Sequence, residues 1–183
     1  FSLDWSDDPQ RLRELLQACV DFAENVSNKK PTENLFLYGP VGTGKTHLCS
    51  AIANYCIQAG VGVVYLKSGR LLDLIREYKF ELDRDDYEGR NRKLEELYHV
   101  ELLIIDDLGT ENLTDFAREQ LLLLIDERIN HRLPLVVSTN LSPNEIGVKY
   151  LVRISDRLLT SSRILKFTGG SFRQRKMLAR VNR

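Results

Sequence analysis

Short apolar runs alternate along the chain with longer segments of helical periodicity. In the longer segments, apolar residues recur at spacings of three and four, as on one face of an amphipathic helix. One short run, Leu102–Ile105, is apolar at every position, which is typical of a parallel strand buried on both faces. The alternation predicts an α/β fold with a mainly parallel sheet. We expect strands at residues 35–38, 61–66, 100–107, 135–138 and 164–167.

Polar residues at the starts of the periodic segments indicate where helices begin. Asp8 before Pro9 fits an N-cap followed by proline at the first helical position. Residues 81–93 differ from these segments, because charges of both signs dominate there and apolar positions are few, so we expect an exposed, mobile connector. The other predicted N-caps are Ser68, Thr114 and Ser142.

Residues 39–46 read GPVGTGKT and fit G-x-x-x-x-G-K-[ST], the phosphate-binding P-loop, at every fixed position. The glycines let the backbone wrap a phosphate chain, and the predicted helix 46–59 adds its dipole. Lys45 would reach the β- and γ-phosphates of ATP, and the Thr46 hydroxyl would ligate Mg²⁺. A chance glycine turn is disfavoured by the strand before and the helix after. The predicted nucleotide-binding residues are Gly39, Pro40, Val41, Gly42, Thr43, Gly44, Lys45, Thr46 and His47.

Polar side chains follow two of the predicted strands. Asp106 and Asp107 end the apolar run 102–105, and Asn140 follows the next strand. Ligands of parallel sheets bind beyond the carboxyl ends of the strands, so Asp106 is a candidate Mg²⁺ ligand. Asp107 is a candidate for orienting or deprotonating the attacking water, and Asn140 for contacting the γ-phosphate or that water. A helix cap or turn at the two acids, and an Asx turn at Asn140, remain alternatives.

Length and composition indicate one domain with a substantial core. We expect an N-terminal helix and linker at residues 1–34 and the main domain at 35–183. No apolar run approaches the length of a membrane span and no secretory signal is present, so we expect a cytoplasmic protein without a membrane partner. Three cysteines without C-x-x-C spacing predict buried, reduced thiols. The chain begins at Phe1 and its only methionine is Met177, so we expect a fragment lacking its N-terminal part.

The net charge is zero but unevenly distributed. From Arg153 onward the chain has nine Lys or Arg and one acid, a net charge of +8, and the preceding residues carry −8. The basic end predicts a surface that meets phosphates or an acidic neighbour, with a solvated terminal helix as the alternative. The candidate nucleic-acid contacts are Arg76, Lys79, Arg90, Arg92, Lys93, Arg175, Lys176 and Arg180.

Four elements together resemble a known family. They are GPVGTGKTHL in the P-loop, LLIIDDLGTE around the two acids, STN at 138–140 and RISDRLL at 153–159. This set is similar to that of the AAA+ ATPases of the DnaC/DnaI helicase-loader group, with IstB as a close cousin. The resemblance covers residues 35–173. It implies a three-layer α/β/α core with five strands in the order 5-1-4-3-2, but no full helical lid.

The same resemblance implies partners and further site residues. The partners are the replicative hexameric DNA helicase and single-stranded DNA, the latter contacted by the insert at residues 69–93. Arg157 matches an arginine finger that acts on the ATP of a neighbouring subunit in a self-assembly, and Arg153 lies one helical turn earlier. Arg173 falls where the family has a sensor-2-like arginine that contacts the nucleotide.

Two alternatives to a helicase loader keep the nucleotide site, and a third changes the nucleotide. The first is an IstB-like transposition ATPase, which these motifs do not distinguish from a loader. The second is a module that holds nucleotide without turnover. A GTPase would need [NT]-K-x-D, and Asn28–Pro31 lacks the Asp. Asp107 stands where most AAA+ proteins have Glu, so we expect slow hydrolysis that depends on assembly.

Overall fold

The computed structural model describes residues 8–81, 87–174 and 177. Its centre is a five-stranded sheet in the order β2-β3-β4-β1-β5, in which every neighbouring pair is parallel. Both the α/β class and the order 5-1-4-3-2 are therefore confirmed. The strands are β1 (Asn34–Tyr38), β2 (Val63–Lys67), β3 (Leu102–Leu108), β4 (Leu135–Thr139) and β5 (Ser162–Lys166).

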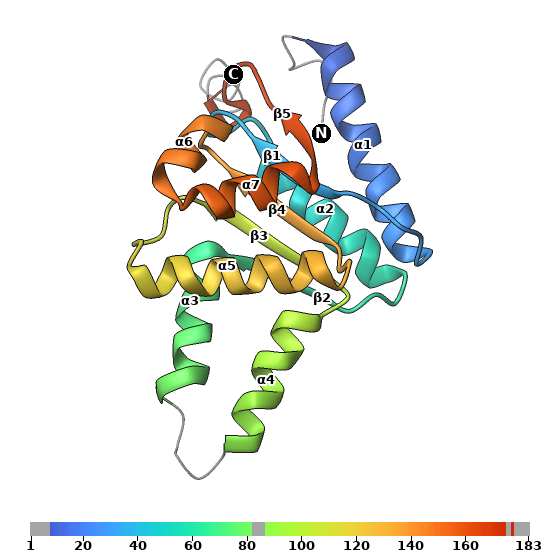
Figure 1. Ribbon diagram of the computed structural model, residues 1–183. Helices are drawn as coiled ribbons and strands as arrows, with labels where there is room; N and C mark the ends of the chain where they lie inside the picture. Colours follow the sequence, from blue (N-terminus) through green and yellow to red (C-terminus); the bar gives the residue numbers. More distant parts are fainter. Residues whose placement is uncertain (1–7, 82–86, 175–176, 178–183) are drawn as a thin grey trace.

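Helices cover both faces of the sheet (Figure 1). Successive residues of a strand point to opposite faces of the sheet. Because helices cover both faces, the three central strands are buried at nearly every position. Leu35 and Leu37 pack with α1 (Pro9–Ser27) and α2 (Lys45–Gln58), whereas Phe36 packs in the other layer. That second layer contains α3 (Ser68–Arg76), α5 (Asp115–Asn130), α6 (Pro143–Lys149) and α7 (Val152–Thr160).

From residue 87 to residue 93 the charged segment is helical and not the connector that its composition predicts. Residues 77–81 form a π-helical turn, and α4 spans Tyr87–His99, while residues 82–86 lie outside the described part. Glu, Lys and Arg are good helix formers, and Leu97 is buried in the same hydrophobic cluster as the apolar residues of α5. Packing at the C-terminal end of α4 therefore stabilises a helix whose N-terminal half has few apolar residues.

Three of the four predicted N-caps are confirmed. The side chains of Asp8, Thr114 and Ser142 accept hydrogen bonds from the backbone three residues later, and Ser142 with Glu145 forms a capping box. The prediction for Ser68 is wrong, because Lys67 is the N-cap of α3. Ser68 is fully buried and its Oγ lies 2.5 Å from a carboxylate oxygen of Glu111. This tertiary partner replaces the cap.

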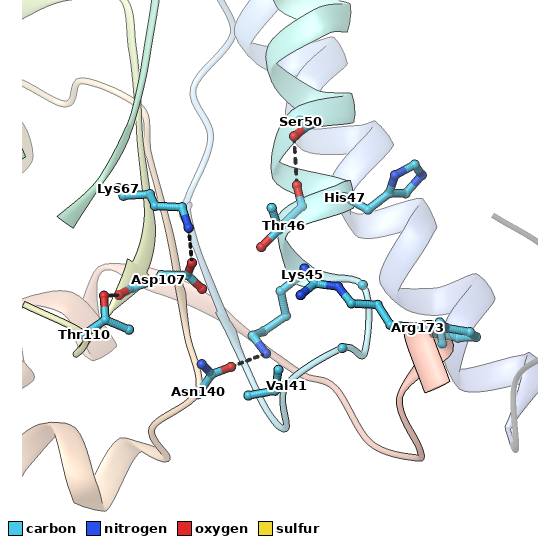
Figure 2. A pocket seen from close by; sticks show the side chains of 13 residues that line it. Val41, Lys45, Thr46, His47, Ser50, Lys67, Asp107, Thr110, Asn140 and Arg173 are labelled. Atoms are coloured by element: carbon cyan, nitrogen blue, oxygen red, sulfur yellow. Dashed lines mark hydrogen bonds and ion pairs between the residues drawn. The ribbon is translucent and has the colours of Figure 1, made fainter. Parts of the chain in front are cut away.

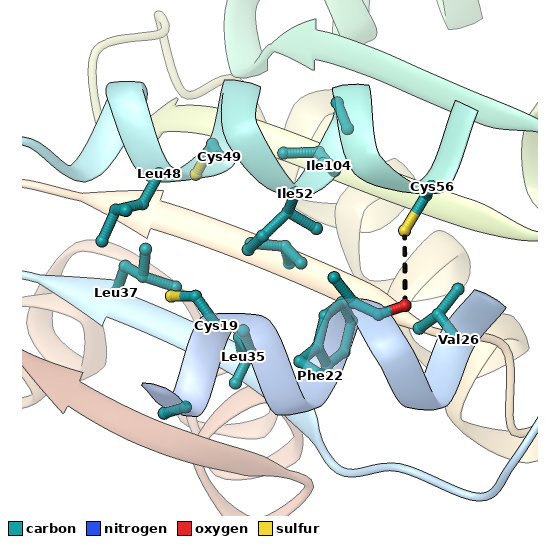
Figure 3. Packing of buried hydrophobic residues seen from close by; sticks show 14 of the residues in the cluster. Cys19, Phe22, Val26, Leu35, Leu37, Leu48, Cys49, Ile52, Cys56 and Ile104 are labelled. Carbon is teal, nitrogen blue, oxygen red and sulfur yellow. Dashed lines mark hydrogen bonds between the residues drawn. The ribbon is translucent and has the colours of Figure 1, made fainter. Parts of the chain in front are cut away.

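The three cysteines are buried free thiols, as predicted. Cys19 lies on α1, and Cys49 and Cys56 lie on the facing side of α2 (Figure 3). Burial raises the pKa of Cys19 to about 12. In the described ranges we find no helix with the length and apolar character needed to cross a membrane. Of the predicted C-terminal basic helix, residues 172–174 are helical, and most of the rest falls outside the described residues.

Arg128 on α5 is a buried cation that links α5 to the end of α4 and to the segments before β3 and β4. Its guanidinium donates to the carbonyl oxygens of Tyr98 (2.9 Å), Val100 (3.0 Å) and Pro134 (2.7 Å). Burial lowers its pKa to about 10, so it stays charged at neutral pH. No local pattern in the sequence indicates this role, because the three carbonyl groups come from the end of α4 and from the loops before β3 and β4.

We expect Arg128→Met to lower the free energy of unfolding by at least about 3 kcal/mol, because three buried carbonyl groups would lose their donor. Urea denaturation followed by circular dichroism measures the change. Arg118→Met on the same helix is the control, since the Arg118 side chain pairs with the fully exposed Asp115. A loss for Arg128→Met no larger than for the control would contradict this role.

Candidate nucleotide-binding site

A cleft of about 840 Å³ lies at the carboxyl edge of the sheet (Figure 2). The P-loop after β1 forms one side, and the ends of β2, β3 and β4 form the other. This is the edge at which parallel sheets bind ligands. Most residues predicted from the sequence therefore lie in one place. The lining consists of Val41, Gly42, Gly44, Lys45, Thr46, His47, Ser50, Lys67, Asp107, Thr110, Asn140, Phe172 and Arg173.

The segment after β5 packs against the P-loop, so a side chain at either of two P-loop glycines would clash with this segment. A Cβ on Gly39 would lie 2.2 Å from the carbonyl oxygen of Phe167, and a Cβ on Gly42 would lie 2.2 Å from Ser171 Oγ. Both glycines also have positive φ. The backbone N–H of Phe172 donates to the Gly42 carbonyl oxygen at 2.9 Å. This contact places Arg173 at the mouth of the cleft.

Lys45 is buried rather than facing solvent, with only 4% of its surface exposed. Its ammonium donates to the carbonyl oxygens of Gly39 (2.6 Å) and Pro40 (2.8 Å) and to Asn140 Oδ1 (2.8 Å). Burial lowers the pKa of Lys45, and the nearby Asp107 and Asp106 oppose that shift. Neutral oxygens are weaker partners for an ammonium than phosphate oxygens, so a phosphate chain can compete for this cation.

Asp106 lies beneath the cleft and is fully buried. Its Oδ1 accepts from Thr46 Oγ1 at 3.3 Å and from the Ser138 hydroxyl, and its Oδ2 accepts from the Tyr65 hydroxyl at 2.8 Å. Burial and this carboxylate raise the pKa of Tyr65. A carboxylate beside a threonine hydroxyl is the hard oxygen donor set that Mg²⁺ prefers, so the two residues fit the predicted ion.

Asp107 lines the cleft, and its backbone has the unusual φ of +56° that Asp tolerates better than most residues. The register between β3 and β4 shifts at this point, and Ser138 Oγ accepts from the Asp107 N–H at 3.1 Å. One carboxylate oxygen pairs with Lys67 Nζ at 3.1 Å. The carboxylate is one-quarter exposed and faces the space beside Lys45 and Asn140.

The three candidate arginines lie in two places. Arg173 lines the cleft, as expected for a nucleotide contact. Arg153 and Arg157 lie on α7, where both pair with Asp126 of α5, at 3.3 Å and 3.1 Å. Among the described residues that line the cleft of this chain, neither is present. Their position on α7 leaves both arginines available for a contact with the nucleotide of another subunit.

Several residues of the site were missed by the sequence analysis. Lys67 forms an ion pair with Asp107, and the hydroxyl groups of Tyr65 and Ser138 donate hydrogen bonds to Asp106. Their common signal is position, because each lies at or near the carboxyl end of a strand adjacent to β3. That neighbourhood follows from the strand order, which the family resemblance implied but which local sequence patterns do not reveal. The Asx-turn alternative for Asn140 is not needed to start α6, since Ser142 is its N-cap.

The model of the family described as "IstB-like ATP binding protein" matches residues 1–179. The replicative helicase loader DnaI of Bacillus subtilis is 30% identical over 142 residues, which cover 76% of this chain and 43% of DnaI. A putative ATP-binding protein of insertion sequence IS5376 from Geobacillus stearothermophilus is 32% identical over 183 residues, covering 96% of this chain and 66% of that protein.

Among solved structures, the DnaC helicase loader superposes with a TM-score of 0.65 at 23% identity, covering 83% of this chain and 89% of that one. At this identity the likeness shows a shared AAA+ P-loop fold. The chain spans about two thirds or less of the length of the two relatives above.

Proposed function

We propose that this chain, which belongs to the family of IstB-like ATP-binding proteins, binds ATP with Mg²⁺ in the cleft and hydrolyses it slowly. One observation carries the proposal. The P-loop lysine and threonine, two acids from β3 and the carboxamide after β4 converge at one edge of the sheet. A cation, hard oxygen donors and an exposed carboxylate are the groups that phosphoryl transfer requires.

Each side chain has a role that follows from its position. Lys45 would exchange its carbonyl partners for β- and γ-phosphate oxygens, while the P-loop N–H groups hold the phosphate chain. Thr46 and Asp106 would hold Mg²⁺, which neutralises charge on the phosphates. Asp107 would orient and deprotonate the attacking water. Asn140, already hydrogen-bonded to Lys45, would contact the γ-phosphate from the opposite side.

Asp107→Asn tests the assigned role of the second acid. We expect ATP affinity to stay within a few fold, because the amide keeps the shape, and turnover to fall roughly 10²–10⁴-fold, because the base is lost. Phosphate release and titration with a fluorescent ATP analogue measure the two quantities. Asp115→Asn is the control, since Asp115 lies exposed at the start of α5. Equal losses of binding and turnover would instead make Asp107 a structural ligand.

For the biological role we propose a helicase loader that helps to place the replicative hexameric DNA helicase on single-stranded DNA. The support is the 30% identity to the replicative helicase loader DnaI. The second candidate is an IstB-like transposition helper. It is favoured by the family match over residues 1–179 and by the IS5376 protein, whose match covers 96% of this chain. Affinity purification of the full-length protein from its host, followed by mass spectrometry, separates them. Recovery of the replicative helicase supports the first, and recovery of a transposase supports the second.

Single-stranded DNA binding is expected to be weak and sensitive to salt. On the insert, the Arg76 guanidinium lies 5.8 Å from the Phe116 ring and Lys93 Nζ lies 5.9 Å from the Tyr78 ring, so both cations rest on aromatic surface. Fluorescence anisotropy with oligothymidine should show affinity falling roughly 20-fold between 50 and 200 mM salt if about three phosphates are contacted. Gln substitutions at the candidate basic residues that left binding unchanged would remove DNA as a partner.

A further inference from the structure

Two histidines and a glutamate meet where α4 approaches α5, on the side of the molecule away from the P-loop. His99 is the last residue of α4, Glu127 lies in the last turn of α5, and His131 is the C-cap of α5. Glu127 and His131 are four residues apart and so lie on one side of that helix. Figure 1 shows the C-terminal end of α4 beside the end of α5.

The ligand atoms of these residues are close to the spacing of a metal site. Glu127 Oε1 lies 3.1 Å from His99 Nε2 and 3.0 Å from His131 Nε2, and the three ligand atoms lie within 4.8 Å of one another. Ligand atoms bound at 2.0–2.1 Å to a tetrahedral zinc ion are about 3.3–3.4 Å apart. Small side-chain rotations would therefore suffice to coordinate one ion.

Both ring nitrogens of His99 face oxygen atoms. Nδ1 lies 3.1 Å from the carbonyl oxygen of Glu95 and 3.1 Å from Glu95 Oε2. Nε2 lies 3.1 Å from Glu127 Oε1, and neither a carbonyl nor a carboxylate oxygen can donate a hydrogen bond. A metal ion between Nε2 and Glu127 would give both atoms a partner. A histidine whose other nitrogen donates to a carbonyl group is also the usual orientation for a metal ligand.

The backbone around His99 is already fixed. The Arg128 guanidinium holds the carbonyl groups of Tyr98 and Val100, the residues on either side of it. The ring is thus presented to Glu127 by contacts that do not involve the ligands themselves. The side chains of His99, Glu127 and His131 are 38%, 36% and 57% exposed, so water can supply a fourth ligand.

We propose that His99, Glu127 and His131 form a binding site for a divalent transition metal ion, zinc by preference, that joins α4 to α5. The donor set of two imidazoles and one carboxylate, with a position open to water, is one that zinc accepts. The ion would be a third link between α4 and the core, in addition to the buried Leu97 and the hydrogen bond from Arg128 to Tyr98. The proposal does not depend on nucleotide binding.

Calorimetric titration of the full chain with ZnCl₂, without nucleotide, tests the site. We expect one ion to bind per chain and its affinity to fall at least about tenfold in His131→Gln and in Glu127→Gln. Glu119→Gln, an exposed glutamate of the same helix, is the matched control and should bind zinc as the wild type does. MgCl₂ should not compete, because imidazole suits softer metals.

A second measurement guards against a variant that fails to fold. Circular dichroism establishes that each variant keeps its helices, and Co²⁺ in place of zinc reports coordination through its visible absorption. We expect the tetrahedral Co²⁺ spectrum in the wild type and its loss in folded His99→Ala. An absence of zinc binding in the wild type would overturn the proposal. Unchanged zinc affinity in the folded His99 and His131 variants would also overturn it.

Discussion

Lys45→Ala is expected to lower ATP affinity roughly 10–100-fold, because a charge-assisted hydrogen bond to phosphate contributes about 1.5–3 kcal/mol. Titration with a fluorescent ATP analogue in the presence of Mg²⁺ measures the change. Lys30→Ala is the control, since Lys30 is exposed in the loop before β1. An affinity within a few fold of wild type for Lys45→Ala would mean that the nucleotide binds elsewhere.

The same substitution is also expected to affect the fold, which the sequence alone did not indicate. Lys45 is buried and donates to two P-loop carbonyl groups, so its loss leaves those acceptors without their partner. A modest fall in thermal stability should accompany the binding defect. Binding must therefore be measured well below the unfolding temperature of the variant, so that the two effects stay separate.

Arg157→Ala is expected to reduce ATP turnover by roughly 10³–10⁵-fold in the assembled protein while leaving ATP binding intact. Arg157 lies on α7, paired with Asp126, and is outside the cleft of its own chain. A contact with the γ-phosphate would then come from a neighbouring subunit. Activity per chain should accordingly rise with protein concentration. Arg163→Ala is the control, because Arg163 is an exposed arginine on β5 rather than on α7.

Mixing two inactive variants tests whether the arginine acts on a neighbour. Arg157→Ala keeps an intact P-loop, and Lys45→Ala keeps an intact arginine. A mixed interface therefore assembles one complete site. Recovery of phosphate release on mixing is the expected result. No recovery, in a preparation shown by light scattering to contain both chains in one particle, would contradict action between subunits.

Much of the fold was predictable because its signals are local. The P-loop, the apolar run before Asp106 and the caps at Thr114 and Ser142 each depend on a few consecutive residues. Strand boundaries were less certain, since β5 begins two residues earlier than predicted, and β2 and β3 begin two residues later. The first two residues of β5, Ser162 and Arg163, are polar and carry no apolar signal.

Features that depend on contacts between distant segments were not predictable. Lys45 reaches back to its own loop and to Asn140, ninety-five residues away. Tyr65 and Ser138 support Asp106 only because β2 and β4 flank β3. The cap assigned to Ser68 failed for the same reason, because Glu111 on a separate loop is its partner. In each case the strand order decides which side chains meet.

Hydrogen–deuterium exchange with and without Mg²⁺ and ATP tests the central claim, that the cleft at the carboxyl edge of the sheet is the ATP site. Amide exchange should slow in peptides covering the P-loop and the start of α2, with smaller protection around Asp107 and Asn140. Lys45→Ala at the same ATP concentration should show little of this protection. Protection confined to other parts of the chain, or none at saturating ATP, would mean that ATP does not bind in this cleft.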